Sequence, residues 1–106
     1  MTQVQEIDAA TLAKLMADDA VVLVDIREVN EWQAERIPGA VLKPMSALNL
    51  TDLVPPPGKK VVLQCRSGRR TMDVGMAMLA NGFEEAAHLT GGIVAWKAAG
   101  LPTQSG

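Results

Sequence analysis

The sequence predicts an α/β fold: a small, open and mainly parallel sheet with helices on both faces. Two observations carry this prediction. Short runs of β-branched and aliphatic residues alternate with stretches of helical spacing, and that alternation is typical of parallel sheets. The run Val21–Val24 is apolar at every position, as in a strand buried on both faces. A length of 106 residues suits one domain with one hydrophobic core, so residues 1–106 are treated as a single unit.

The first part of the chain predicts a strand, a helix and a second strand. Val4–Ile7 fits a short edge strand, and Asp8 after it is a favourable helix N-cap. Apolar residues then recur at helical spacing before Asp18-Asp19, namely Leu12, Leu15 and Met16. The apolar strand Val21–Val24 follows.

The middle of the chain predicts shorter elements. We expect a short helix over residues 29–34, a turn at Ile37-Pro38-Gly39 and a short strand over residues 40–42. Residues 46–53 fit a short helix. The proline-rich stretch over residues 54–58 is expected to be a surface connector.

The last part predicts two further strands, each followed by a helix. The strand Val61–Gln64 leads into the only cysteine, and a helix follows with an apolar stripe of Met72, Met76 and Leu79. Asn81-Gly82 is a helix-ending signal. A strand over residues 86–89 and a turn at residues 90–92 then lead to a last helix over residues 93–99.

Three loops follow the carboxyl ends of predicted strands: residues 25–28, 65–70 and 90–92. Parallel strands place all three loops at one edge of the sheet, where ligands of such folds bind. The loops should therefore surround one site.

Cys65 is the candidate nucleophile of this site. A loop that joins a strand to a helix presents backbone N–H groups and a positive dipole end, which favour the thiolate of a cysteine placed there. Gly68 allows the backbone to curl closely around the sulfur. The Ser67 hydroxyl either donates to the sulfur or simply serves the tight turn.

Three arginines add positive charge to the loop, namely Arg66, Arg69 and Arg70. Cations at a helix N-terminus cost about 0.3–1 kcal/mol each. A bound anion would offset that cost, so the cluster indicates a functional site. Arg66 and Arg70 are expected to face the site or brace the loop, whereas Arg69 could equally be solvated.

Other polar residues near these loops have structural interpretations. Asp25 and Arg27 form either a strand-end salt bridge or a support for the Cys65 loop. Glu31 and Arg36 are expected to pair with each other. His88, late in a predicted strand, is interpreted as structural, so no catalytic base is evident. A thiolate that is already formed can attack sulfur without one.

Composition excludes several classes of function. The net charge of −2 gives no basic excess for nucleic acid. No apolar run approaches the roughly 20 residues of a membrane span, and no signal peptide is visible. One cysteine allows neither an internal disulfide nor a cysteine-rich metal site. Without a phosphate-binding glycine motif, we expect no cofactor and no metal, in a reducing cytoplasm.

Taken together, the motifs resemble those of a single-domain rhodanese-like sulfurtransferase, over about residues 5–101. They stand in the family's order and are Asp25-Ile26-Arg27-Glu28 with Glu31-Trp32, Ile37-Pro38-Gly39-Ala40, Cys65-Arg66-Ser67-Gly68-Arg69-Arg70, and Gly91-Gly92-Ile93-Val94-Ala95-Trp96. Arg36 departs from the histidine that the family usually has before the Ile-Pro-Gly-Ala turn.

The resemblance implies a rhodanese-like fold and a sulfurtransferase activity. Cys65 would take sulfane sulfur from a small donor, such as thiosulfate or a persulfide, and pass it to cyanide or a thiol. Loop N–H groups would hold the outer sulfur, with Arg66, Ser67, Gly68, Arg69 and Arg70 binding substrate and Asp25 and Arg27 supporting the loop. A thioredoxin-like or other sulfur-relay protein is a candidate partner.

Two alternatives stay open at this point. Phosphatase or arsenate-reductase chemistry uses a C-x5-R loop, whereas Arg70 follows Cys65 after four residues and position 71 is threonine. The other alternative is a module that carries persulfide or binds a partner without turnover.

Overall fold

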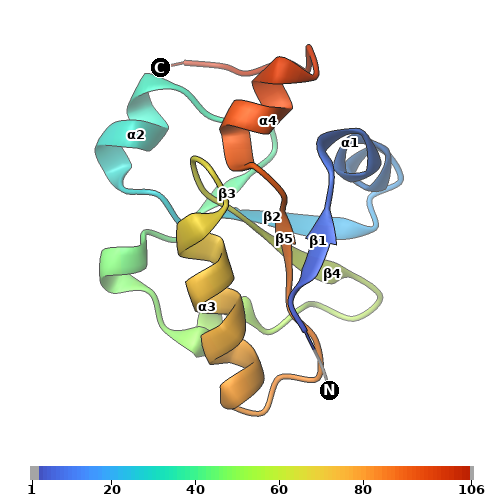
Figure 1. Ribbon diagram of the computed structural model, residues 1–106, viewed down its shortest axis with the longest axis vertical. Helices are drawn as coiled ribbons and strands as arrows, with labels where there is room; N and C mark the ends of the chain where they lie inside the picture. The colour runs from blue at the N-terminus through green and yellow to red at the C-terminus, as the bar shows by residue number, and fades with distance from the viewer. Residues whose placement is uncertain (1–2, 106) are drawn as a thin grey trace.

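The structure, a computed structural model, describes residues 3–105 and has the predicted α/β architecture (Figure 1). Residues 1, 2 and 106, which the single-domain prediction includes, lie outside the described part. Five parallel strands form one sheet in the order β1-β5-β4-β2-β3. The strands are β1 (Gln5–Ile7), β2 (Val21–Asp25), β3 (Val41–Leu42), β4 (Lys60–Gln64) and β5 (Ala87–Leu89).

Helices cover both faces of the sheet, as predicted. They are α1 (Ala9–Ala17), α2 (Val29–Ala34), α3 (Arg69–Ala80) and α4 (Gly92–Ala98). The α1 and α4 helices pack on one face around Leu12, Leu89 and Trp96. The α3 helix packs on the other face around Leu63 and Met78. None of these helices, all within residues 3–105, is long and apolar enough to cross a membrane.

The predicted start of α1 is confirmed in detail. Asp8 is the N-cap, and its carboxylate accepts a hydrogen bond of 2.8 Å from the Thr11 N–H. β1 lies at an edge of the sheet, as the short run Val4–Ile7 predicted. The adjoining Val4 side chain packs instead on Gly75 of α3, where a Cβ would come within 2.8 Å of it.

Two predictions about helices are corrected by the structure. Residues 46–53 form no α-helix but two 3₁₀ turns, η1 (Met45–Ala47) and η2 (Leu50–Leu53). Only Leu53 of these turns is buried, so little apolar area is available to stabilise a longer helix there.

The buried face of α3 is also different from the predicted stripe. Thr71, Val74, Gly75 and Met78 face the sheet, while Met76 is 59% exposed. The predicted stripe of methionines and Leu79 lines a hollow at the surface together with Val4 and Glu6. Apolar spacing alone could not distinguish the two sides of this helix, because both carry apolar residues.

The three predicted loops meet at one edge of the sheet, beyond the carboxyl ends of β2, β4 and β5. Close backbone contacts join two of them: the N–H groups of Ile93 and Val94 donate to the carbonyl oxygens of Cys65 and Arg66, at 2.9 and 3.1 Å. Gly92 permits this approach. A Cβ at Gly92 would lie 2.3 Å from the Arg66 carbonyl oxygen and 2.5 Å from that of Cys65.

This contact predicts a stability difference between two glycine substitutions. Gly58 and Gly92 both have positive φ, at +79° and +60°, but a Cβ at Gly58 meets nothing within 4 Å. Gly58→Ala should therefore cost only the left-handed strain of about 1–2 kcal/mol. Gly92→Ala should cost about 1–3 kcal/mol more, because the backbone must also shift. Urea unfolding of both variants measures the difference, and equal losses would contradict the close approach.

Candidate active site

The loop from Cys65 to Arg70 is held in a tight curl at the start of α3. Gly68 is the N-cap of the helix, with φ of +99°, and its N–H donates to the Cys65 Sγ at 3.2 Å. A Cβ at Gly68 would lie 3.3 Å from the Gly91 nitrogen, so glycine is needed here for space as well as for conformation. The Cys65 carbonyl oxygen is fixed by the Gln64 side-chain amide at 2.9 Å.

The sulfur of Cys65 lies in an environment that stabilises the thiolate. The residue is only 1% exposed, and burial by itself raises the pKa of the Cys65 thiol. Hydrogen bonds from the Thr71 hydroxyl and from the backbone N–H groups of Thr71, Gly68 and Ser67 outweigh burial and hold the pKa below its ordinary value. The side-chain hydroxyl within hydrogen-bond distance of the sulfur is that of Thr71, at 3.6 Å, and not that of Ser67.

Arg70 joins the loop to α2 through an ion pair with Glu31. Two guanidinium nitrogens donate to the two Glu31 carboxylate oxygens, both at 2.9 Å. The hydrogen bond from Arg70 holds the pKa of Glu31 at about 2, and the pair raises the pKa of Arg70. The bidentate bond thus explains why a cation is tolerated in the first turn of α3.

The predicted pair of Glu31 with Arg36 is therefore wrong. Arg36 instead lies over the ring of Trp32, 5.0 Å from its centroid, and donates to the Trp32 carbonyl oxygen at 3.1 Å. The two residues that do pair, Glu31 and Arg70, are 39 positions apart. Arg36 was predicted as the partner of Glu31 because it lies close to it in the sequence.

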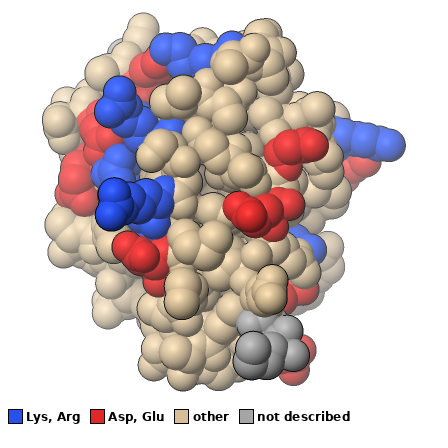
Figure 2. All heavy atoms as spheres, in the orientation of Figure 1, with Lys and Arg blue, Asp and Glu red and all other residues tan. Residues whose placement is uncertain are grey.

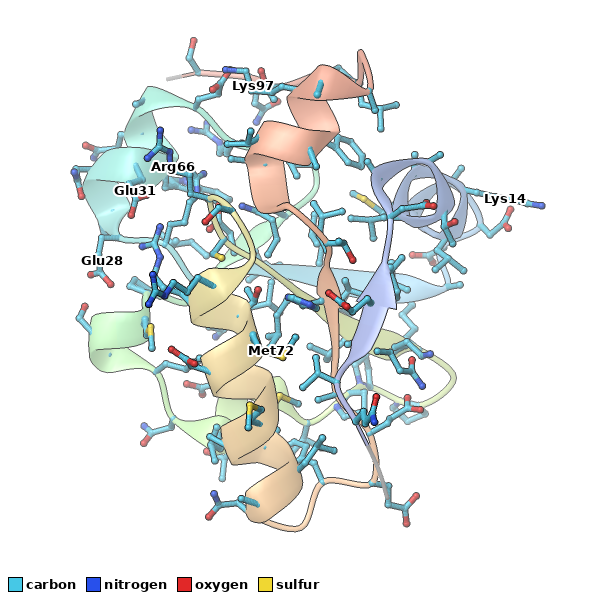
Figure 3. The ribbon with its side chains drawn as sticks, viewed as in Figure 1. Lys14, Glu28, Glu31, Arg66, Met72 and Lys97 are labelled. Carbon is cyan, nitrogen blue, oxygen red and sulfur yellow. The ribbon has the colours of Figure 1, made fainter. Side chains whose placement is uncertain are left out.

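Arg66 is exposed and borders a hollow between the loop, α2 and α4. The hollow has a volume of about 350 Å³, and its lining includes Arg27, Glu31, Val94 and Lys97. Figure 3 shows Arg66 beside Glu31, on the side of the loop that faces α2. In Figure 2, basic side chains gather over this part of the molecule, with acidic side chains next to them. Arg69 is also exposed.

Asp25 and Arg27 form a buried pair beneath this hollow. They are 0% and 4% exposed, and the Arg27 guanidinium donates to both Asp25 carboxylate oxygens. It also donates to the Glu35 carbonyl oxygen at 2.7 Å, just past the end of α2. Arg27 thus links the end of β2 to the end of α2. The α2 helix in turn holds Arg70 through Glu31.

Sequence reasoning missed a polar cluster that adjoins the sulfur through Thr71. The Thr71 hydroxyl lies 2.6 Å from the His88 Nδ1, and the His88 Nε2 lies 3.2 Å from a Glu6 carboxylate oxygen. His88 is 2% exposed and is the register partner of Glu6 across β5 and β1. The signal in the sequence was the pattern of β5, where alternation places His88 on the same face of the sheet as α3.

Among residues 3–105, no three or more histidine, cysteine or acidic side chains cluster closely enough to hold a metal ion. The described residues do bring together the parts of a nucleophilic site. A buried, hydrogen-bonded sulfur lies next to cationic side chains that can meet an anion.

Comparisons with known proteins agree with this arrangement. A family model described as the rhodanese-like domain matches residues 8–99. A sulfurtransferase of Allochromatium vinosum is 37% identical over 100 residues, covering 93% of this chain and 94% of that protein. An uncharacterized protein of Synechocystis, slr1261, is 44% identical over 93 residues, covering 88% of this chain. This chain spans only 52% of that relative's length.

Solved structures agree as well. The crystal structure of a thiosulfate sulfurtransferase from Pseudomonas aeruginosa superposes with a TM-score of 0.84 at 25% identity. The match covers 97% of this chain and 20% of that one. The family match over most of the chain, with a sulfurtransferase relative aligned almost end to end, shows that this chain belongs to the rhodanese-like domain family.

Proposed function

We propose that the chain moves sulfane sulfur from a donor, such as thiosulfate or a persulfide, to a thiophilic acceptor through a persulfide on Cys65. The observation that carries this proposal is the set of hydrogen-bond donors around one buried sulfur. The Gly68 N–H donates to the sulfur at 3.2 Å, and the Thr71 hydroxyl lies 3.6 Å from it. Together with the backbone N–H groups of Ser67 and Thr71, they hold the Cys65 pKa below its ordinary value despite burial. A thiolate is the nucleophilic form of cysteine.

The proposed reaction has two halves. In the first, the Cys65 thiolate attacks the outer sulfur of the donor, a sulfur–sulfur bond forms on Cys65, and the remainder of the donor leaves with the electron pair of the broken bond. With thiosulfate the leaving group is sulfite. In the second half, a nucleophilic acceptor such as cyanide or a thiol takes the outer sulfur, and the Cys65 thiolate is restored.

The arginines of the loop have separate roles in this proposal. Arg66 is exposed at the hollow and is placed to meet an anionic donor. Arg70 is engaged with Glu31 and braces the loop. That engagement also disfavours phosphatase chemistry, because Arg70 is not free to bind the peripheral oxygens of a phosphoryl group. We propose a sulfur-relay protein, thioredoxin-like or other, as physiological partner and the cytoplasm as location.

The persulfide can be tested by intact-mass spectrometry. After incubation with thiosulfate, the mass of the wild-type protein should rise by one sulfur atom, and cyanide should remove it. Cys65→Ser should remain folded, accept no sulfur and show no transfer, because no other cysteine exists in the chain. Sulfur transfer by that variant would sink the mechanism. Loading without repeated turnover would identify a carrier, and hydrolysis of a phosphate ester would favour the phosphatase alternative.

The pKa of Cys65 predicts how its reactivity depends on pH. The rate of alkylation by iodoacetamide should rise with pH through a midpoint below the roughly 8.5 of a free thiol, since thiolate persists to lower pH in the folded loop. Below that midpoint the thiol is protonated and the rate falls. The unfolded protein in denaturant is the control and should show the ordinary midpoint. Equal midpoints in both states would mean that the loop does not stabilise the thiolate.

The roles of the arginines predict different kinetic losses. Arg66→Ala should weaken mainly the use of anionic donors, by about ten- to a hundredfold if a charge-assisted hydrogen bond of about 1.5–3 kcal/mol is lost. Arg70→Ala should slow transfer from every donor, and Glu31→Gln should act in the same direction because it breaks the same brace.

Lys14→Ala, which removes an exposed cation of α1 outside the loop, is the control and should change little. Donor-by-donor kinetics decide the question. Equal losses for all donors in both the Arg66 and the Arg70 variants would show that this division of roles is wrong.

A further inference from the structure

The proposed sulfur-transfer chemistry gives no role to the polar cluster of Thr71, His88 and Glu6 beneath α3. It forms a continuous hydrogen-bonded line from the reacting atom to the surface: Cys65 Sγ, Thr71 Oγ1, His88 Nδ1, His88 Nε2 and Glu6 Oε1. The successive distances are 3.6, 2.6 and 3.2 Å, with the imidazole ring between its two nitrogens. Glu6 is 57% exposed at the outer end, whereas the His88 side chain is 3% exposed.

The proton count of this line depends on the state of the sulfur. Thr71 has one hydroxyl proton and three acceptors within reach: the Cys65 sulfur, the His88 Nδ1 and, at 3.1 Å, the Gly68 carbonyl oxygen. Glu6 requires a proton on the facing His88 Nε2, because a carboxylate only accepts. The His88 Nδ1 is then the nitrogen that can be either protonated or unprotonated.

Two arrangements satisfy these bonds. With neutral His88, the Thr71 hydroxyl donates to Nδ1, and the Cys65 thiol donates to the Thr71 oxygen. With the imidazolium, Nδ1–H donates to the Thr71 oxygen, and the hydroxyl is free to donate to the Cys65 thiolate. A charged acceptor makes the stronger hydrogen bond, so the second arrangement favours the hydroxyl turning to the sulfur.

We propose that His88 is the proton acceptor for the Cys65 thiol, with Thr71 as the relay between them and Glu6 as the group that fixes the ring. The S–H bond of Cys65 breaks as an O–H bond forms on Thr71. The original hydroxyl proton of Thr71 moves to the His88 Nδ1. The electron pair stays on sulfur, and no oxidant or reductant takes part. Thr71 touches the reacting sulfur, His88 acts on it only through Thr71, and Glu6 is a positioning residue that fixes the ring.

Few other charges face the ring. Glu6 lies beside it on β1, and Cys65 lies at the end of β4. The α3 helix, packed above, also carries Arg69, Arg70 and Asp73. Arg70 is bound to a carboxylate of α2, and the side chains of Arg69 and Asp73 are exposed. The groups that face the ring are therefore Cys65, through Thr71, and Glu6.

The inference rests on the proposed function for its purpose, but its test needs no sulfur transfer. The chain has one histidine and one cysteine, so each can be titrated without ambiguity. NMR follows the imidazole, and the pH dependence of alkylation follows the thiol. Two groups coupled in this way titrate as a pair, and each must shift the other equally.

The expected result is a reciprocal shift of the two midpoints. In Cys65→Ser the midpoint of the histidine titration should fall, because no thiolate remains to favour the imidazolium. In His88→Asn the alkylation midpoint should rise by a similar amount. Thr71→Val should give both shifts, whereas Thr71→Ser, which keeps the hydroxyl, should give neither. Glu6→Gln should shift both midpoints in the same directions but less, because Glu6 is half exposed.

Two results would overturn the relay. The first is an equal midpoint of the histidine titration in wild type and in Cys65→Ser. This comparison keeps the buried ring, so it can be made even if His88→Asn fails to fold. The second is a Thr71→Val variant in which Cys65 and His88 still shift each other's midpoint, because the coupling would then act through space and not through the Thr71 hydroxyl. Reciprocal shifts in a protein that never loads sulfur would uphold the relay while refuting the proposed function.

Discussion

The site depends on holding the negative charge of one sulfur atom that is almost completely buried. Burial alone disfavours a thiolate, so every surrounding element must supply a donor or hold one in place. The glycine at position 68 brings its N–H to the sulfur, and the first turn of α3 brings the Thr71 hydroxyl. The α4 helix closes on the loop backbone at Gly92, which keeps those donors in position.

Two ion pairs hold the loop that surrounds this sulfur in place. Arg70 would be unfavourable at the start of α3, yet its bond to Glu31 turns it into a tether between the loop and α2. The buried pair of Asp25 and Arg27 fixes α2 against the sheet. Only Arg66 among the arginines of the motif is left at the hollow where a donor would arrive. Of the three arginines in the loop, Arg66 is exposed at the hollow, Arg70 is bound to Glu31, and Arg69 is exposed.

Much of this arrangement could be predicted from the sequence. The run Val21–Val24 of β2 is continuously apolar because both faces of the sheet are covered, and parallel strands bring their following loops to one edge. What could not be predicted were pairings between distant positions. Glu31 binds Arg70, 39 residues away, and Thr71 binds His88. Local patterns carry no information on such partners, and the lone histidine was interpreted as structural because it lies late in a predicted strand. The 3₁₀ turns after β3 were missed for a different reason, since helical spacing without burial does not stabilise a helix.

The central claim is that the curled loop surrounds a sulfur anion, and a crystal structure of the thiosulfate-treated protein tests it most directly. The account predicts one additional sulfur atom bonded to the Cys65 Sγ, inside the loop and within hydrogen-bond distance of its N–H groups, with the Arg70–Glu31 pair unchanged. An additional sulfur pointing away from the loop, a loop that has opened to accommodate it, or an unmodified Cys65 in protein that transfers sulfur would contradict the account.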